Sequence, residues 1–197
     1  MSGFALKQIP DGFYYALTPF TMIDYPDKTA CVVWFSGCNM RCHYCHNPEL
    51  VRRKKGKPLA EVLDFLQKRK GLLDGVVLSG GEATCSKPVI DFARQVKSMG
   101  FDVKLDTNGL NPGRLEVMMD AGLLDYVALD YKAPREKFSF VTGVDKFARF
   151  SKSLDMLCAQ SLVPFEVRTT VHTALLDEHD VNSIIADLAL RGYAGTY

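Results

Sequence analysis

Short apolar segments alternate with longer amphipathic segments along the chain, and this alternation restricts the fold more than any other feature of the sequence. Residues typical of buried strands occupy 30–35, 75–78, 102–106, 126–130 and 165–171. Apolar residues at helical spacing occupy 59–70, 88–99, 112–121, 145–160 and 178–190. Successive strand-to-helix steps favour parallel strands, because parallel neighbours need a crossover connection. A doubly wound sheet and a barrel both satisfy this order.

The final residues, Ala194-Gly195-Thr196-Tyr197, are typical of the start of a sixth strand that stops before it can pair. We therefore expect a truncated sixth strand and a chain that is a fragment at this end. No internal repeat, low-complexity segment or Pro/Gly-rich linker divides the sequence. One domain over residues 1–197 is the expected organisation.

The composition excludes several classes of protein. Apolar residues make up 47% and charged residues 24% of the chain, which is an ordinary globular mixture. The 24 Lys and Arg against 23 Asp and Glu give a formal net charge of +1, so no nucleic-acid or membrane partner is expected. The N-terminus lacks a secretory signal, and no apolar run approaches the roughly 20 residues that cross a bilayer. These observations predict a cytoplasmic protein.

Three cysteines follow the first predicted strand with C-x3-C-x2-C spacing: Cys38, Cys42 and Cys45. Parallel α/β folds place their sites at this end of the strands, and clustered thiols in a reducing compartment indicate a metal. Three thiolates can hold three corners of an iron–sulfur cube and leave one iron open to a ligand that is not protein. S-adenosylmethionine can supply an amino nitrogen and a carboxylate oxygen to that iron.

Two non-enzymatic alternatives fit the same loop. Cys42 to His46 also has the C-x-x-C-H spacing that attaches c-type haem, although haem leaves Cys38 without a role. Zinc could be held by the three cysteines with His43 or His46, although structural zinc usually takes two ligands from each of two separated loops. Both alternatives remain open at this point.

Beyond the cysteine spacing, the chain resembles the radical S-adenosylmethionine enzymes. Tyr44-Cys45-His46-Asn47 is similar to the corresponding segment of glycyl-radical-enzyme activases, those of pyruvate formate-lyase or of anaerobic ribonucleotide reductase. The longer run 38–50 is most similar to activating proteins of anaerobic ribonucleoside-triphosphate reductase. The segment 21–26 is similar to the lead-in to their first strand. The resemblance covers about 18–197, with 1–17 as an N-terminal lead-in, and implies a partial (β/α)6 TIM-like barrel of parallel strands.

The resemblance implies a [4Fe-4S] cluster on the three cysteines and contacts to S-adenosylmethionine at the ends of successive strands. The implied contacts are Tyr44, Cys45, His46, Ser79, Gly80, Gly81, Glu82, Asp106, Asn108, Asp130, Lys132, Arg168 and His172. Glycines let the backbone approach a ligand closely, and the Glu82 carboxylate can accept bonds from the cofactor amine. Ala83 stands where many of these enzymes have proline. The resemblance also allows a monovalent cation at the acidic residues.

Structural roles are the alternatives for several of these residues. Asp130 and Lys132 could form an ion pair at the rim of the barrel. Arg168 and His172 are expected on one side of the fifth strand, because side chains alternate along a strand. Arg168 could pair with the cofactor carboxylate. For His172, ligand contact and an ordinary surface position are equally open.

The resemblance further implies the reaction and its partners. The cluster, reduced by an external one-electron donor such as flavodoxin or ferredoxin, would cleave S-adenosylmethionine, and the 5′-deoxyadenosyl radical would take a hydrogen atom from a glycine of a partner enzyme. No catalytic residue beyond the cluster and the cofactor is expected, and the expected partner is anaerobic ribonucleotide reductase. The alternative enzyme acts on a small molecule, as 7-carboxy-7-deazaguanine synthases do, but those typically have Asp-Thr in place of His46-Asn47.

The sequence contains one charge run, Arg52-Arg53-Lys54-Lys55-Gly56-Lys57. Such runs are usually solvated surface, and docking of an acidic partner is the alternative.

Overall fold

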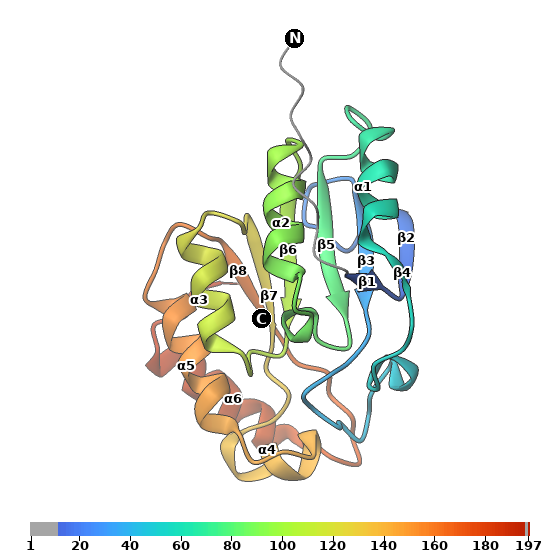
Figure 1. Cartoon of the computed structure of the whole chain (residues 1–197). Coiled ribbons are helices and arrows are strands. Elements are labelled where there is room, and N and C mark those ends of the chain that lie inside the picture. Colours follow the sequence, from blue (N-terminus) through green and yellow to red (C-terminus); the bar gives the residue numbers. More distant parts are fainter. Residues whose placement is uncertain (1–11, 196) are drawn as a thin grey trace.

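A six-stranded sheet is the centre of the computed structural model, which describes residues 12–195 and 197 (Figure 1). Its strands, in spatial order, are β2 (Ala16–Thr21), β3 (Ala30–Phe35), β5 (Gly75–Gly80), β6 (Asp102–Thr107), β7 (Tyr126–Asp130) and β8 (Phe165–Arg168). Strands β3, β5, β6, β7 and β8 are parallel to one another, and β2 pairs antiparallel with β3. This parallel sheet with helical crossovers confirms the predicted α/β class of a partial barrel.

The helices pack on one face of the sheet (Figure 1). They are α1 (Leu59–Gln67), α2 (Val89–Ser98), α3 (Pro112–Asp120), α4 (Arg135–Thr142), α5 (Phe147–Cys158) and α6 (Glu178–Leu190). Their buried side chains form one apolar core with alternate strand residues such as Val33, Leu78 and Leu105. None of the helices in the described part of the chain is long and apolar enough to cross a membrane.

The other face of the sheet changes from apolar to charged across the strands. Because side chains alternate along a strand, residues between the core positions face away from the helices. On β3 and β5 these include Val32 and Val77, which pack in a second small core. On β6 and β8 they are charged, and include Lys104 and Glu166. This charged part of the face continues to Asp106 and Arg168, at the carboxyl ends of β6 and β8.

Among the described residues, three strands and one helix were not expected from the sequence. The edge strand β2 pairs Ala16 with Trp34 and Thr21 with Ala30. The sequence predicted a lead-in over 1–17 and a segment from residue 21 that leads into the first strand, but no strand here. Helix α4 occupies a segment with no predicted element, because its apolar residues are few and the helix is short. Two short strands, β1 (Phe13–Tyr14) and β4 (Lys57–Pro58), form a separate antiparallel pair.

The predicted end of the strand over 165–171 was wrong. Strand β8 ends at Arg168 and not at residue 171, because its neighbour β7 ends at Asp130 and offers no further ladder partners. The described residues after α6 form no sixth strand, and Thr196 lies outside the described residues. Instead, the Tyr193 hydroxyl accepts a hydrogen bond from the Val167 N–H at 3.0 Å. Residues 1–11, which carry most of the lead-in and the export prediction, also lie outside the described residues.

Candidate functional site

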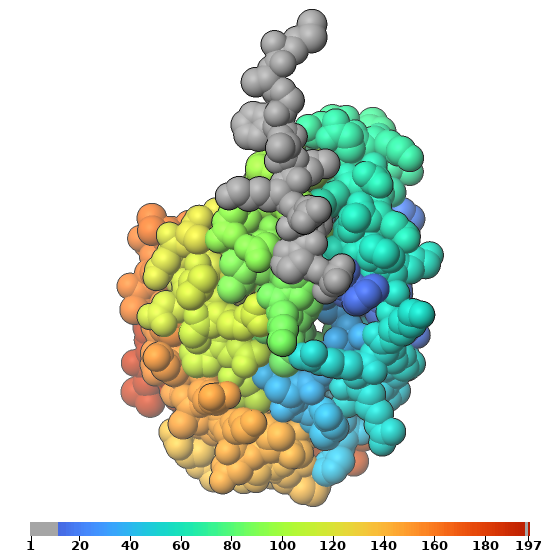
Figure 2. Space-filling model, in the orientation of Figure 1, coloured from blue at the N-terminus to red at the C-terminus, as the bar shows by residue number. Residues whose placement is uncertain are grey.

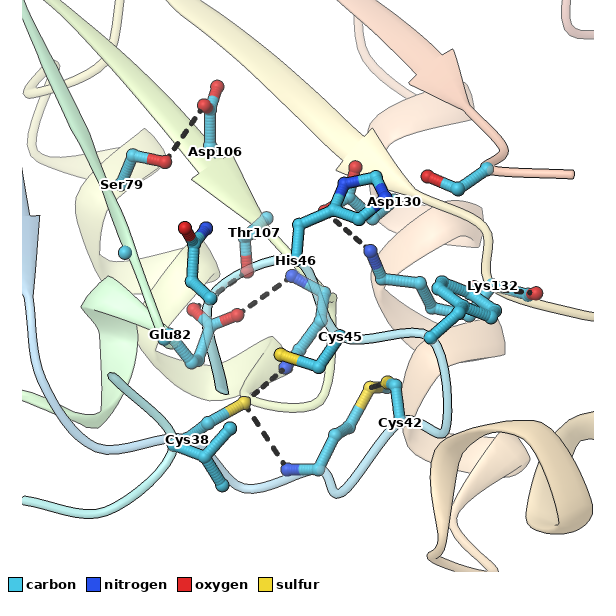
Figure 3. A pocket seen from close by; sticks show the side chains of 18 of the residues that line it. Cys38, Cys42, Cys45, His46, Ser79, Glu82, Asp106, Thr107, Asp130 and Lys132 are labelled. Carbon is cyan, nitrogen blue, oxygen red and sulfur yellow. Dashed lines mark hydrogen bonds and ion pairs between the residues drawn. The ribbon is translucent and has the colours of Figure 1, made fainter. Parts of the chain in front are cut away.

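A cavity of about 330 Å³ opens at the carboxyl ends of the parallel strands (Figure 3). Its lining includes every residue expected at the site except His172: Cys38, Cys42, Tyr44, Cys45, His46, Ser79, Gly80, Gly81, Glu82, Asp106, Asn108, Asp130, Lys132 and Arg168. Because parallel strands end at one edge, residues distant in sequence converge there. The structure therefore brings together the side chains that the sequence placed on separate segments.

The cysteine loop is held by backbone hydrogen bonds on both sides. On one side, the N–H groups of Gly37 and Cys38 donate to the Leu50 and Val51 carbonyls at 2.7 and 3.0 Å. On the other side, Arg41 N–H donates to the Thr142 carbonyl at 2.8 Å, and His43 N–H donates to Val141 at 3.1 Å. Thr142 and Val141 end α4, where helix carbonyls lack partners within the helix. The helix that sequence analysis missed is thus one of the anchors of the loop.

Three thiols share the cavity wall, whereas Cys31, Cys85 and Cys158 do not line it. The Cys38 sulfur accepts from Met40 N–H at 3.4 Å and from the Asn108 side-chain amide at 3.8 Å. Burial raises the pKa of Cys38 to about 12, so binding of a metal must displace its proton. This donor set of three thiols on one loop fits an iron–sulfur cluster with one iron open.

A site for a single metal ion, such as zinc, requires at least three ligand side chains close enough to contact one ion. Among residues 12–195 and 197, no three His, Cys, Asp or Glu side chains are close enough to share a single ion. The three thiols with His43 or His46 are therefore not arranged as a zinc site in this structure.

Gly80, the last residue of β5, and Gly81, which follows it, lie where other parts of the backbone come very close. Gly80 has φ of +126°, a conformation that side chains rarely adopt. A Cβ on Gly81 would lie 2.6 Å from the Gly37 carbonyl oxygen and 2.7 Å from that of Leu50. The next N–H, of Glu82, donates to Gly37 at 3.0 Å. The close approach expected for a ligand is thus made here by the chain itself.

Glu82 is buried and connects the ends of two strands (Figure 3). Its Oε1 accepts from Thr84 N–H at 3.0 Å, from Thr84 Oγ1 at 2.5 Å and from Thr107 Oγ1 at 3.0 Å. Its Oε2 accepts from Asn108 N–H at 2.7 Å. Burial raises the pKa of Glu82, and these hydrogen bonds oppose the rise. Both carboxylate oxygens are therefore engaged by the chain, and the contact with the cofactor amine that the resemblance implies stays a prediction.

A network of alternating charges borders the cavity: Asp106, Asp130 and Arg168 line it, and the buried Lys104 lies behind them. Asp106 accepts from Lys104 Nζ at 2.8 Å and from the Ser79 hydroxyl at 3.1 Å. Arg168 lies between two carboxylates, 3.1 Å from Asp130 and 3.7 Å from Asp106. Lys104 is 1% exposed, and sequence analysis did not identify it. Its position two residues before Asp106 on one strand was the available signal.

Asp130 and Lys132 form the ion pair that was considered as an alternative, with the oxygen and nitrogen 3.0 Å apart. Burial favours neutral forms of both groups, but their mutual attraction outweighs it: the pKa of Asp130 is lowered, also by Arg168, and that of Lys132 is raised. Both therefore stay charged while lining the cavity. Tyr44 donates its hydroxyl hydrogen to the Lys132 carbonyl at 3.1 Å and closes this side of the cavity.

The acidic residues considered for a monovalent cation already have cationic neighbours, and the cation stays a prediction. Asp106 already faces the ammonium of Lys104, and Asp130 faces Lys132 and Arg168.

His172 lies outside the cavity lining. It follows the end of β8 and is exposed, and its Nδ1 accepts from Ala174 N–H at 3.3 Å. The expectation that it shares a strand face with Arg168 was wrong because the strand is too short. The cavity is also lined by Trp34, Thr107 and Thr169, which sequence analysis did not single out.

Comparisons with known proteins relate most of the chain to one family of proteins. The family model described as the radical SAM superfamily matches residues 32–187. A Methanocaldococcus jannaschii protein with the provisional name glycyl-radical enzyme activating enzyme is 38% identical over 178 residues, which cover 85% of this chain and 72% of that protein. The pyruvate formate-lyase-activating enzyme of Clostridium pasteurianum is 32% identical, over 73% of this chain and 63% of that enzyme. Among solved structures, Streptococcus suis SuiB bound to the precursor peptide SuiA has a TM-score of 0.66 at 15% identity, over 84% of this chain and 37% of SuiB.

Proposed function

This chain belongs to the radical SAM superfamily, and on that premise we propose that it is an activating enzyme that installs a glycyl radical on a partner enzyme. Membership of this enzyme family overturns the alternative of a non-enzymatic zinc or haem module. The observation that carries the proposal is that one cavity is lined both by the three thiols of the cysteine loop and by charged side chains at the strand ends. Sequence identity of 38% and 32% to the two activating enzymes, over 85% and 73% of this chain, supports the same activity.

In this proposal, Cys38, Cys42 and Cys45 hold a [4Fe-4S] cluster. When bound, the cluster and S-adenosylmethionine supply the radical that takes a hydrogen atom from the glycine of the partner. The chain's own residues bind and orient the cofactor. Its ammonium and carboxylate need opposite charges at fixed positions, and the cavity offers Asp130 close to Lys132 and Arg168 for this purpose.

Two partners belong to the same proposal. Anaerobic ribonucleotide reductase is the expected protein substrate, and flavodoxin or ferredoxin is the expected electron donor. This chain spans 72% and 63% of the two activating enzymes it matches. The names of these relatives specify neither ribonucleotide reductase nor an electron donor, so both partners rest on the resemblance of the sequence motifs.

The first test is cleavage of S-adenosylmethionine by the protein itself. The chain is reconstituted with iron and sulfide without oxygen and reduced with dithionite, and 5′-deoxyadenosine is measured by chromatography. We expect product from wild type and from Cys158→Ala, and none from Cys42→Ala. Cys158 is the matched control because it is also a partly buried thiol but does not line the cavity. Product from Cys42→Ala would refute the proposed cluster ligands.

The second test identifies the substrate class. Purified anaerobic ribonucleotide reductase is added, and the glycyl radical is sought by electron paramagnetic resonance. We expect a radical on the reductase that requires both S-adenosylmethionine and this protein. Production of 5′-deoxyadenosine without any radical on the reductase, or on a second glycyl-radical enzyme such as pyruvate formate-lyase, would favour the small-molecule alternative.

A further inference from the structure

A strongly basic segment borders the cysteine loop. We define the basic segment as residues 52–57, whose charged members are Arg52, Arg53, Lys54, Lys55 and Lys57, all exposed. The net charge of the whole chain is only +1, so this is a local concentration of charge. Within the described part of the chain, none of the ion pairs involves these five side chains. Their charge is therefore available to a partner.

The basic segment is fixed to the outer wall of the cysteine loop. The Lys54 N–H donates to the Ser36 hydroxyl at 3.1 Å, and that hydroxyl donates to the Lys54 carbonyl at 3.3 Å. The Arg53 guanidinium donates to the Cys85 carbonyl at 3.0 Å, and its Cγ lies 2.8 Å from where a Cβ on Gly37 would stand. In Figure 2 the basic segment, in cyan, adjoins the light-blue cysteine loop on the same face. A protein that docks here would lie beside the cluster ligands.

The basic segment does not line the cavity. The lining includes Val51 but none of residues 52–57. A partner bound to the segment would therefore leave the mouth of the cavity open. The protein substrate must present its glycine inside the cavity, whereas an electron donor needs only to approach the cysteine loop from outside.

We propose that the basic segment is the docking surface for an acidic protein that donates one electron. The proposal rests on the proposed function, because that function requires an external reductant. The donor loses one electron and the iron–sulfur centre gains it, and no bond or proton changes at the docking surface. Opposite charges on two proteins raise the rate of encounter and make it sensitive to salt.

The test uses two triple variants with equal charge change. Arg52→Gln, Lys54→Gln and Lys55→Gln neutralise the segment and leave Arg53 to hold the loop. Lys68→Gln, Arg69→Gln and Lys70→Gln are the control, at the opposite, amino-terminal edge of the sheet, just after α1. Each triple takes the net charge from +1 to −2 (1 − 3 = −2). Each also removes one cation from an aromatic ring 5.2 Å away, Lys54 from Tyr15 and Arg69 from Phe65.

The reconstituted proteins are titrated with an oxidised acidic flavodoxin at low ionic strength, and their reduction by reduced flavodoxin and by dithionite is followed by stopped-flow absorbance. We expect the segment variant to lose about tenfold in affinity and in reduction rate with flavodoxin. Its reduction by dithionite should stay within twofold of wild type, as should both rates of the control variant. Wild-type affinity for flavodoxin should also fall as salt rises, which tests the proposal even if the variant folds poorly.

Three outcomes would overturn the docking proposal: equal losses in both triple variants, no loss in either, or wild-type affinity independent of salt. A segment variant that takes electrons normally but activates its glycyl-radical partner poorly with dithionite would also overturn it, in favour of substrate docking. Failure of wild type to form 5′-deoxyadenosine with dithionite would count against the proposed function alone, because flavodoxin affinity is measured separately.

Discussion

Replacement of Glu82 by glutamine should destabilise the protein strongly. The size of this effect distinguishes a carboxylate that holds the fold together from one that binds the cofactor. In the structure the carboxylate accepts four hydrogen bonds of 2.5 to 3.0 Å from Thr84, Thr107 and Asn108. A glutamine keeps one acceptor oxygen and places an NH₂ group where the other was. If the oxygen takes the Oε1 position, the NH₂ group faces the Asn108 N–H, and two donors oppose each other.

The magnitude follows from these contacts. A buried hydrogen bond to a charged group contributes about 2 kcal/mol, and the three that remain weaken because their acceptor is neutral. Relief of the cost of burying a charge offsets part of this loss. The expected net decrease in the free energy of unfolding is about 3 kcal/mol, a large share of the 5–15 kcal/mol typical of a folded protein.

Urea unfolding of the apoprotein measures this change directly. Glu116→Gln is the control, because Glu116 is exposed on α3, and its effect should stay within about 0.5 kcal/mol. Titration with S-adenosylmethionine completes the comparison. If Glu82→Gln unfolds within about 1 kcal/mol of wild type but loses its affinity for S-adenosylmethionine, the carboxylate binds the cofactor and our assignment of its partners is refuted.

Three further predictions rest on other contacts. Lys104→Met should lower the free energy of unfolding by about 3 kcal/mol, since Asp106 would lose its buried partner; a loss below about 1 kcal/mol in urea unfolding would show that water replaces the ammonium. Gly81→Ala should lower the iron bound after reconstitution because its Cβ would displace the cysteine loop, whereas Gly113→Ala, with nothing within 4 Å, should leave iron content unchanged. Asp177→Asn should lower the thermal midpoint at pH 7, because hydrogen bonds at the start of α6 lower the pKa of Asp177 and so stabilise its charged form. Its folded pKa lies below its unfolded one, so the difference in midpoint between wild type and variant should vanish as pH falls below about 4. A difference that persists at pH 2 would contradict this origin.

The segments of the fold that obey local rules were predictable. The strands Ala30–Phe35 and Tyr126–Asp130 and the helix Glu178–Leu190 have the predicted bounds, because their apolar spacing and flanking residues are local signals. The edge strand β2 was missed because its pairing with β3 is antiparallel and leaves Phe20 exposed, so it lacks the pattern of a buried strand.

For the site, the sequence alone determined which chemistry gathers at the strand ends, because the spacing of Cys38, Cys42 and Cys45 and the order of the motifs are local properties of the chain. Only the tertiary structure decided which groups those side chains contact. It engaged the Glu82 oxygens with donors about 25 residues away, brought Arg168 between Asp106 and Asp130, and joined α4 to the cysteine loop. The physical reason is that a lone pair or a charge can be satisfied only once in a close-packed interior, and which partner satisfies it depends on how distant segments pack.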